Sequence, residues 1–238
     1  MKLDILVFAV HPDDAELACS GTILKQIALG YKVGIVDLTR GELGTRGTAE
    51  DRDKEAAESA AILGLSIREN VRLSDGFFEN NKASQLALVK YIRKYQPELV
   101  LGNAPEDRHP DHGRAGKLIE DACFLSGLRK IETQFDGEVQ NEWRPSQLFH
   151  YIQDRYIKPD FVVNVTPFWK TKVAAIKAFK TQFYNPESDE PETYISSGDF
   201  FQFIEARSRE IGHQIGATHG EGFVKSKQIG ISDIMKLS

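Results

Sequence analysis

Two nearly identical tetrapeptides, "HPDD" at residues 11–14 and "HPDH" at residues 109–112, carry the residue types in this sequence that are best suited to chemistry. Imidazole nitrogen and carboxylate oxygen are good zinc ligands, and a catalytic zinc takes three protein ligands and leaves a fourth position for water. His11 and Asp14 from one segment, with His112 from the other, would supply that set. Proline fixes φ in each segment and lowers the entropy lost in holding ligands still. The spacing therefore predicts one metal site shared by two segments.

The remaining polar residues of the two tetrapeptides predict acid–base chemistry at that site. Asp13 has no evident structural task and is the candidate general base, which would take a proton from the attacking water and later deliver it to a leaving amine. His109, if protonated, would stabilise an oxyanion, and Asp111 would orient it through the other ring nitrogen. Either tetrapeptide alone is more typical of a structural turn, because proline and aspartate both favour turns. Their occurrence as a pair, each after a predicted strand, favours the metal site.

The sequence "RGELGTRGTAEDR" places Arg40, Arg46 and Arg52 among glycines and threonines. One interpretation is a mobile lid that offers guanidinium groups to a carboxylate or phosphate of the substrate. The alternative is a solvated loop that leads into a charged helix. The glycines do not match G-x-G-x-x-G and no P-loop lysine follows, so the segment gives little support to nucleotide binding.

Alternating strand and helix patterns must position these residues. In the first half, the patterns predict strands over residues 4–10, 32–39, 70–75 and 98–104, and helices over residues 16–30, 48–64 and 82–95. In the second half, they predict helices over 115–127, 168–183 and 199–216, strands over 147–153 and 161–165, a polar connection over 129–146, and a mobile acidic loop over 185–193. Such alternation implies one α/β domain with a mainly parallel sheet and helices on both faces.

Ligands of such sheets bind at the carboxyl ends of the strands. His11 follows the first predicted strand, and residues 103–115 contain the second tetrapeptide and follow the strand over 98–104. The arginine-containing segment follows the second strand. We therefore expect three neighbouring strand ends to converge on one crevice.

Composition limits the classes of protein that this chain can belong to. It has 238 residues, of which 41% are hydrophobic and 27% charged, an ordinary globular balance. The net charge of -5 and the absence of a long basic run exclude nucleic acid as the main partner. Cys19 and Cys123 are too few for a disulfide scaffold. The apolar run over residues 5–10 is too short for a signal peptide or a membrane span, so we expect a soluble, cytoplasmic protein without a membrane partner.

The two segments "AVHPDDAELACSGT" and "APEDRHPDHGRA" resemble the LmbE-like, or PIG-L, family of zinc-dependent N-deacetylases. That resemblance implies a Rossmann-like α/β fold over residues 1–238, with a regular core over 1–127 and a less regular completion of the sheet, substrate pocket and oligomer contacts over 128–238. Further stretches, including "ETYISSGDFFQFIEARSREIG" and "GEGF", are similar to the bacillithiol biosynthesis branch. That branch removes acetate from N-acetyl-α-D-glucosaminyl L-malate, and its members tend to form hexamers.

The resemblance also implies a role for each matching position. It makes His11, Asp14 and His112 the ligands of one zinc ion, and iron(II) or cobalt would suit the same residues. It makes Asp13 the general base and His109 the oxyanion-stabilising residue, oriented by Asp111. For the branch, the resemblance makes Arg52 a residue that contacts the malate carboxylate or the sugar hydroxyls, and Tyr194 a candidate for the pocket wall. Arg46, from the same loop, is a further candidate for contact with substrate.

One position departs from the family, and other functions stay open. Relatives commonly carry Gly-Gly where this chain has Ser20-Gly21, so a side chain at position 20 is a candidate for narrowing the pocket, and the sequence leaves its effect open. Within the enzymes, the same motifs would serve an amidase acting on a thiol conjugate or a deacetylase acting on another sugar such as chitobiose. Outside them, the chain would be a sugar- or nucleotide-binding module whose His-Pro-Asp turns are only structural.

Overall fold

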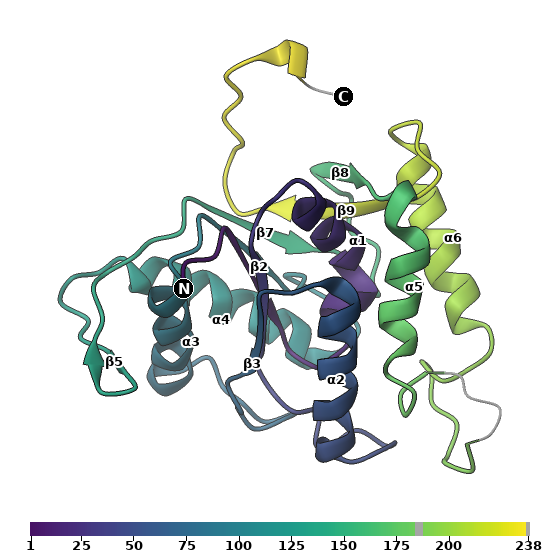
Figure 1. The fold of residues 1–238 in the computed structure, drawn as a ribbon, viewed down its shortest axis with the longest axis horizontal. Helices are drawn as coiled ribbons and strands as arrows, with labels where there is room; N and C mark the ends of the chain where they lie inside the picture. The colour runs from purple at the N-terminus through teal and green to yellow at the C-terminus, as the bar shows by residue number, and fades with distance from the viewer. Residues whose placement is uncertain (184–187, 237–238) are drawn as a thin grey trace.

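The computed structural model describes residues 1–183 and 188–236. Its main sheet has seven strands in the order β3-β2-β1-β4-β7-β9-β8, and β9 is antiparallel to both of its neighbours while the other adjacent pairs are parallel (Figure 1). The strands are β1 (Ile5–Ala9), β2 (Val33–Asp37), β3 (Ile67–Asn70), β4 (Leu99–Gly102), β7 (Gln147–Tyr151), β8 (Phe161–Asn164) and β9 (Gly220–Lys225). A separate hairpin pairs β5 (Gln134–Phe135) with β6 (Glu138–Val139).

Helices cover both faces of this sheet (Figure 1). They are α1 (Asp14–Ala28), α2 (Ala49–Leu63), α3 (Lys82–Tyr95), α4 (Pro110–Ser126), α5 (Trp169–Lys177) and α6 (Phe200–His213), with 3-10 turns at Thr166–Phe168 and Ile234–Lys236. In the described part of the chain, no helix is both long and apolar enough to cross a membrane. The α/β class expected from the sequence is confirmed.

The alternation of side chains along β1 divides the core into two layers. Leu6 and Phe8 pack in the cluster formed with α3 and α4, whereas Ile5 and Val7 pack in the cluster formed with α1. Successive side chains of a strand point to opposite faces, so this fully apolar strand buries both faces at once. It fixes the position of the segment that follows it, which begins with His11.

Several predicted boundaries are wrong for local reasons. The third strand lies at 67–70 instead of 70–75, because its residues "IREN" are too polar for an apolar-run criterion. Strand β9 was not predicted, since its glycines lower the β-propensity of "GEGFVK". Helix α5 ends at Lys177 instead of residue 183. The helix over 82–95 is confirmed with both ends. The acidic loop predicted over 185–193 lies partly outside the described residues.

The buried carboxylate of Glu221 links helix α1 to strand β9 of the sheet. Glu221 of β9 accepts hydrogen bonds from the backbone N–H groups of Gly21 and Thr22 at 2.9 and 2.7 Å, inside α1. Lys172 of α5 donates from Nζ to Glu221 Oε1 at 2.6 Å and to the carbonyl oxygen of Leu17 at 2.9 Å. Glu221 and Lys172 are 3% and 2% exposed in their side chains. The pair therefore anchors α1, which carries Asp14, to α5 and β9.

We expect the substitution Glu221→Ala to lower the free energy of unfolding by about 3 to 5 kcal/mol, because it leaves the buried Lys172 ammonium without its carboxylate partner and the buried Thr22 hydroxyl without its acceptor. Urea unfolding followed by circular dichroism measures the loss. Glu205→Ala removes a surface carboxylate that is 44% exposed and pairs with Arg209, and it serves as the control with little expected change. Equal stability of the two variants would contradict the assignment.

Candidate active site

The two His-Pro-Asp segments lie at the starts of helices and not within loops as predicted. Asp13 is the N-cap of α1, and Asp14 is its first residue. His109 is the N-cap of α4, which begins at Pro110 and includes His112 in its first turn. The helices follow β1 and β4, which are adjacent strands whose flanking connections run in opposite directions along the sheet order. This switch point is where doubly wound sheets bind ligands.

The carboxylate of Asp14 lies at the centre of the cluster. Its Oδ2 accepts from the backbone N–H of His11 at 3.0 Å and from Asn103 Nδ2 at 3.1 Å. The ring nitrogens nearest to it are Nδ1 of His11, at 3.6 Å from Oδ2, and Nε2 of His112, at 3.2 Å from Oδ1. Burial by itself would raise the pKa of Asp14, but the charge of His112 and the hydrogen bonds from both imidazoles hold it well below its usual range. Asp14 is therefore ionised and faces two imidazoles.

In His11 and in His112, the ring nitrogen that does not face Asp14 lies next to a second carboxylate. His11 Nε2 lies 3.0 Å from Asp75 Oδ1, and His112 Nδ1 lies 2.5 Å from Asp107 Oδ2. A carboxylate on one ring nitrogen fixes the tautomer and leaves the other nitrogen as the ligand. The free nitrogens of both rings face Asp14.

These carboxylates also shift the pKa of the imidazoles. Burial lowers the pKa of an imidazole, but Asp14 and Asp75 together raise that of His11 to about 10. Asp14 and Asp107 raise that of His112 to about 9 against the same effect of burial. The shifts show how strongly negative the surroundings of the two rings are, and such surroundings favour a bound cation.

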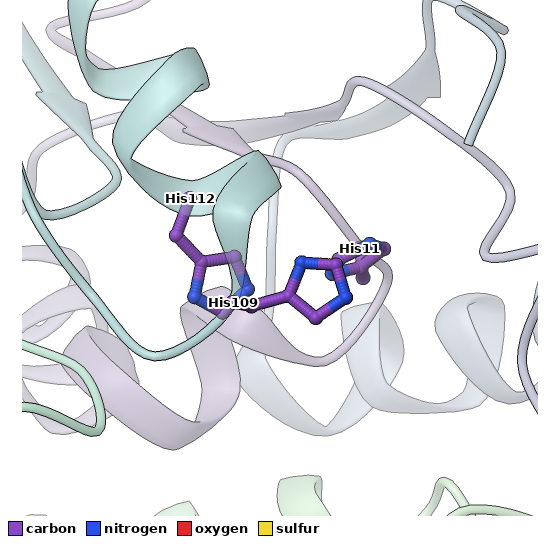
Figure 2. A group of neighbouring side chains, drawn as sticks. All are labelled: His11, His109 and His112. Atoms are coloured by element: carbon purple, nitrogen blue, oxygen red, sulfur yellow. The ribbon is translucent and has the colours of Figure 1, made fainter. Parts of the chain in front are cut away.

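His109 completes a group of three imidazoles, with ring centroids 4.8 Å from His11 and 5.1 Å from His112 (Figure 2). The expected contact between its ring and the Asp111 carboxylate is not among the hydrogen bonds of the described residues. Asp111 instead accepts from Gly76 N at 2.8 Å and from Arg114 Nη1 at 2.7 Å, and its backbone N–H donates to His109 Nδ1 at 3.3 Å. The helix cap, and not the carboxylate, therefore orients the ring.

The environment of His109 also differs from the protonated ring that was expected. Burial and the charges of His11 and His112 lower its pKa. With Nδ1 accepting a hydrogen bond, the neutral ring carries its proton on Nε2.

Asp13 is held in a conformation that side chains rarely adopt. Its φ is 149°, the residue is 4% exposed, and its carboxylate accepts from Arg52 Nη1 at 2.8 Å. Arg52 also donates to the carbonyl oxygen of Pro12 at 3.2 Å, so one guanidinium fixes the backbone and the side chain at this turn. Burial raises the pKa of Asp13, and the charge of Arg52 opposes that rise. Arg52 therefore contacts the candidate base directly and also lines the cavity, and its contact with substrate stays a prediction.

The other two predicted substrate residues lie in different places. Arg46 is buried, donates from Nη2 to Ser188 Oγ at 2.6 Å, and does not line the cavity at the site. Its Nε lies 3.5 Å from Glu190 Oε2, so the acidic loop is its neighbour in this structure, and its contact with substrate stays a prediction. Tyr194 lines the cavity and is 51% exposed, with its hydroxyl donating to Asp154 Oδ1 at 3.2 Å.

Position 20 does not narrow the pocket. Ser20 is fully buried, its hydroxyl donates to the carbonyl oxygen of Glu16 at 2.7 Å, and it does not line the cavity. Its neighbour Gly21 is the constrained position, since a Cβ there would lie 2.7 Å from Val165 Cβ. The expectation that Ser20 alters the pocket is therefore wrong.

The cluster opens into a cavity of about 590 Å³. Arg108 and Arg207 lie at its walls and both contact Asp154, Arg108 through the carboxylate at 2.5 Å and Arg207 through the carbonyl oxygen. The Arg108 guanidinium lies 4.6 Å from the centre of the Tyr194 ring. These groups form a cationic and aromatic wall beside the imidazoles.

Sequence reasoning missed Asp75, Asp107 and Asn103. Each stands within or just after a predicted strand end, so the same criterion that selected His11 would have included them. The sequence could not show which residues they contact. His11 and Asp75, for example, are 64 residues apart in the chain.

A histidine and carboxylate cluster at the switch point of a mostly parallel sheet places this chain among the α/β enzymes. The profile of the PIG-L family, described as GlcNAc-PI de-N-acetylase, matches residues 6–123. A solved structure, the conserved protein TT1542 from Thermus thermophilus, is 34% identical with a TM-score of 0.86 and 98% of each chain covered.

Three curated relatives match at lower identity. Diacetylchitobiose deacetylase of Thermococcus kodakarensis is 27% identical over 75% of this chain and 70% of its own. A 4-oxalmesaconate hydratase of Pseudomonas putida is 28% identical over 74% and 73%. A probable N-acetyl-alpha-D-glucosaminyl L-malate deacetylase 2 of Bacillus anthracis is 29% identical over 75% and 81%. The chain belongs to the PIG-L/LmbE-like family, in which two of these relatives are named as deacetylases.

We expect Arg52→Met to lower the free energy of unfolding by about 3 kcal/mol, because it leaves the buried Asp13 carboxylate unpaired at a strained position. Denaturant unfolding at pH 7 measures the change. Lys54→Met on the same helix removes an ion pair whose lysine is 75% exposed and is the matched control. A loss no larger than that of the control would show that Arg52 does not hold Asp13.

Proposed function

We propose that this protein is a metal-dependent N-deacetylase that hydrolyses N-acetyl-α-D-glucosaminyl L-malate to glucosaminyl malate and acetate. The observation that carries the reaction class is the ionised Asp14 carboxylate facing the free nitrogens of His11 and His112, with Asp13 adjacent in the chain. The named deacetylases among its relatives support the same reaction. The malate glycoside rests on the sequence resemblance and on one relative at 29% identity.

The donor set fits a divalent metal. His11 Nδ1, the Asp14 carboxylate and His112 Nε2 would hold it, while Asp75 and Asp107 keep the rings oriented. Two nitrogens and one carboxylate oxygen suit zinc, and iron(II) or cobalt would suit them as well. When bound, the metal supplies Lewis acidity that activates water and polarises the acyl carbonyl.

The residues around this site have distinct tasks in the proposed reaction. Asp13, paired with Arg52, takes a proton from the attacking water and delivers it to the amine nitrogen as the carbon–nitrogen bond breaks. His109 is fixed through Nδ1 by the N–H of Asp111, so its Nε2–H is available to the carbonyl oxygen, where negative charge develops. Burial of Asp13 strengthens its interactions, because little water competes for them, whereas His109 is half-buried.

The wall formed by Arg108, Arg207 and Tyr194 supports an anionic substituent on the sugar. Guanidinium groups bind carboxylates in paired hydrogen bonds, and malate carries two carboxylates. Arg108 already pairs with the Asp154 carboxylate, and a neutral sugar such as diacetylchitobiose would add no negative charge beside Arg108 and Arg207. The charge of the wall therefore favours the malate glycoside over the chitobiose alternative.

Acetate release from N-acetylglucosaminyl malate should be rapid, at least tenfold slower from free N-acetylglucosamine, and lost on chelation. Zinc add-back should restore it. An enzymatic acetate assay of both substrates, run before chelation, after chelation and after zinc add-back, measures these rates. Equal, chelator-sensitive release from the free sugar would retain the deacetylase and reject the malate glycoside. No metal retained by the purified protein would favour the non-catalytic binding module.

Asp13→Asn should lower kcat by a factor of roughly 10² to 10⁴ while the bound metal stays stoichiometric, because asparagine keeps the shape of the side chain and an oxygen for Arg52 but cannot take up the proton. His112→Ala should lose the metal first and activity as a consequence. Metal analysis alongside acetate release separates the two effects.

The matched controls are Asp160→Asn and His213→Ala, which change residues of the same types away from the cavity. Near-normal turnover of Asp13→Asn would show that another group is the base. Stoichiometric metal in His112→Ala would remove that residue from the ligand set.

A further inference from the structure

A glutamine just after β7 lies beside the candidate metal site. Strand β7 pairs in parallel with β4, so the segment that follows β7 reaches the same edge of the sheet as Asn103, which follows β4. Ile152, Gln153 and Asp154 of this segment line the cavity. The proposed reaction gives no task to Gln153, and its contacts show what that task is.

The orientation of both side-chain amides follows from the charge of Asp14. Asn103 Nδ2 lies 3.1 Å from Asp14 Oδ2 and 3.0 Å from Gln153 Oε1. An ionised carboxylate only accepts hydrogen bonds, so the nitrogen of the Asn103 amide, and not its oxygen, faces Asp14. That nitrogen carries a further N–H, which needs an acceptor, so Gln153 turns its oxygen towards Asn103. The amide nitrogen of Gln153 therefore points away from Asn103.

The amide nitrogen of Gln153 is a donor without a partner. Among the described residues, none accepts a hydrogen bond from Gln153 Nε2, and this atom is not one of the buried polar atoms that lack a partner. Gln153 is half-buried and lines the cavity. The N–H groups of its amide are therefore accessible to a ligand in the cavity.

The residues that follow Gln153 hold it in place. The Asp154 carboxylate accepts from Arg108 Nε at 2.5 Å, and the backbone N–H of Arg155 donates to Asp107 Oδ1 at 2.6 Å. On its other side, Gln153 is fixed through its own amide oxygen, as described above. A donor that is held in this way loses little conformational entropy when a ligand accepts its hydrogen bond.

We propose that Gln153 binds the substrate, with Nε2 donating to an oxygen on a ring carbon next to the carbon that carries the acylamino group. This inference rests on the proposed amide hydrolysis at the sugar nitrogen. Gln153 is connected to Asp14 through a single amide group, that of Asn103, so an amide that reacts at Asp14 brings the neighbouring ring oxygen, at C1 or C3, within reach of Gln153. Gln153 therefore selects amides that carry an oxygen on the adjacent carbon over simple alkyl amides.

The first test measures acetate release by the metal-loaded protein from methyl N-acetylglucosaminide, from an analogue without the C3 hydroxyl and from an analogue without the C1 oxygen. We expect kcat/KM for one analogue to be about fivefold to tenfold below that for the parent glycoside, since one neutral hydrogen bond is lost. The affected analogue identifies the oxygen. Equal values for all three substrates would overturn the inference and leave the proposed deacetylase intact.

Variants of Gln153 provide the second test, with the ratio of kcat/KM for the parent glycoside to that for the affected analogue as the readout. Gln153→Met removes the donor and keeps the length of the side chain, so the ratio should fall to about one. Gln153→Glu also removes the N–H groups but keeps an oxygen for Asn103, so it should lose the same selectivity with the metal still stoichiometric. Gln214→Met changes an exposed glutamine outside the cavity and should leave the ratio unchanged.

The ratio separates a contact with substrate from a role in positioning. A variant that only disturbs Asn103 or Asp14 lowers hydrolysis of the parent and of the analogue alike. An unchanged ratio in both variants of Gln153, or an equal change in Gln214→Met, would therefore overturn the inference. Absence of acetate release by the unmodified protein from every substrate, the malate glycoside included, would overturn the proposed function and the inference with it.

Discussion

The buried carboxylate of Asp14 is the interaction on which the site depends. It is 3% exposed and needs partners on every side, because an ionised carboxylate without them is costly to bury. The backbone of His11, the amide of Asn103 and the ring of His112 supply them from the ends of β1 and β4 and from the first turn of α4. The switch point of the sheet brings these segments together, so the order of strands decides whether the cluster exists.

Asp13, the residue before Asp14, is subject to a second constraint, which is on its backbone conformation. The backbone of Asp13 is strained, and strain of this kind persists only where its surroundings hold it. Arg52 bonds to its carboxylate and to Pro12 and lies close over Gly41, where a Cβ would be 2.7 Å from Arg52 Nη2. Gly41 has a φ of +65°, so glycine fits this position both because its φ is positive and because there is no room for a Cβ. Helix α2 thus supports the reacting carboxylate from a distance in the chain.

The lining of the cavity is chemically mixed. Cationic and aromatic groups come from the segment before α4 and from α6, and apolar side chains come from α6 and α1. The candidate catalytic residues lie at the starts of helices α1 and α4, and the rest of the cavity lining comes from both halves of the chain. Relatives with the same fold are named for different substrates, which agrees with a fixed site and variable walls.

The sequence by itself determined what depends on neighbouring residues: the apolar strand β1, the helix over 82–95, the α/β class and the paired histidine and aspartate segments. It could not determine what depends on distant ones. The pairing of His11 with Asp75 and of Asp13 with Arg52 requires strands and helices to be placed first. The glycine-containing strand β9 carries no local pattern of a strand. Its Glu221 is held by hydrogen bonds to the backbone of α1, about 200 residues away in the chain. Only the tertiary structure decided these contacts, since burial and charge pairing act through space and not along the chain.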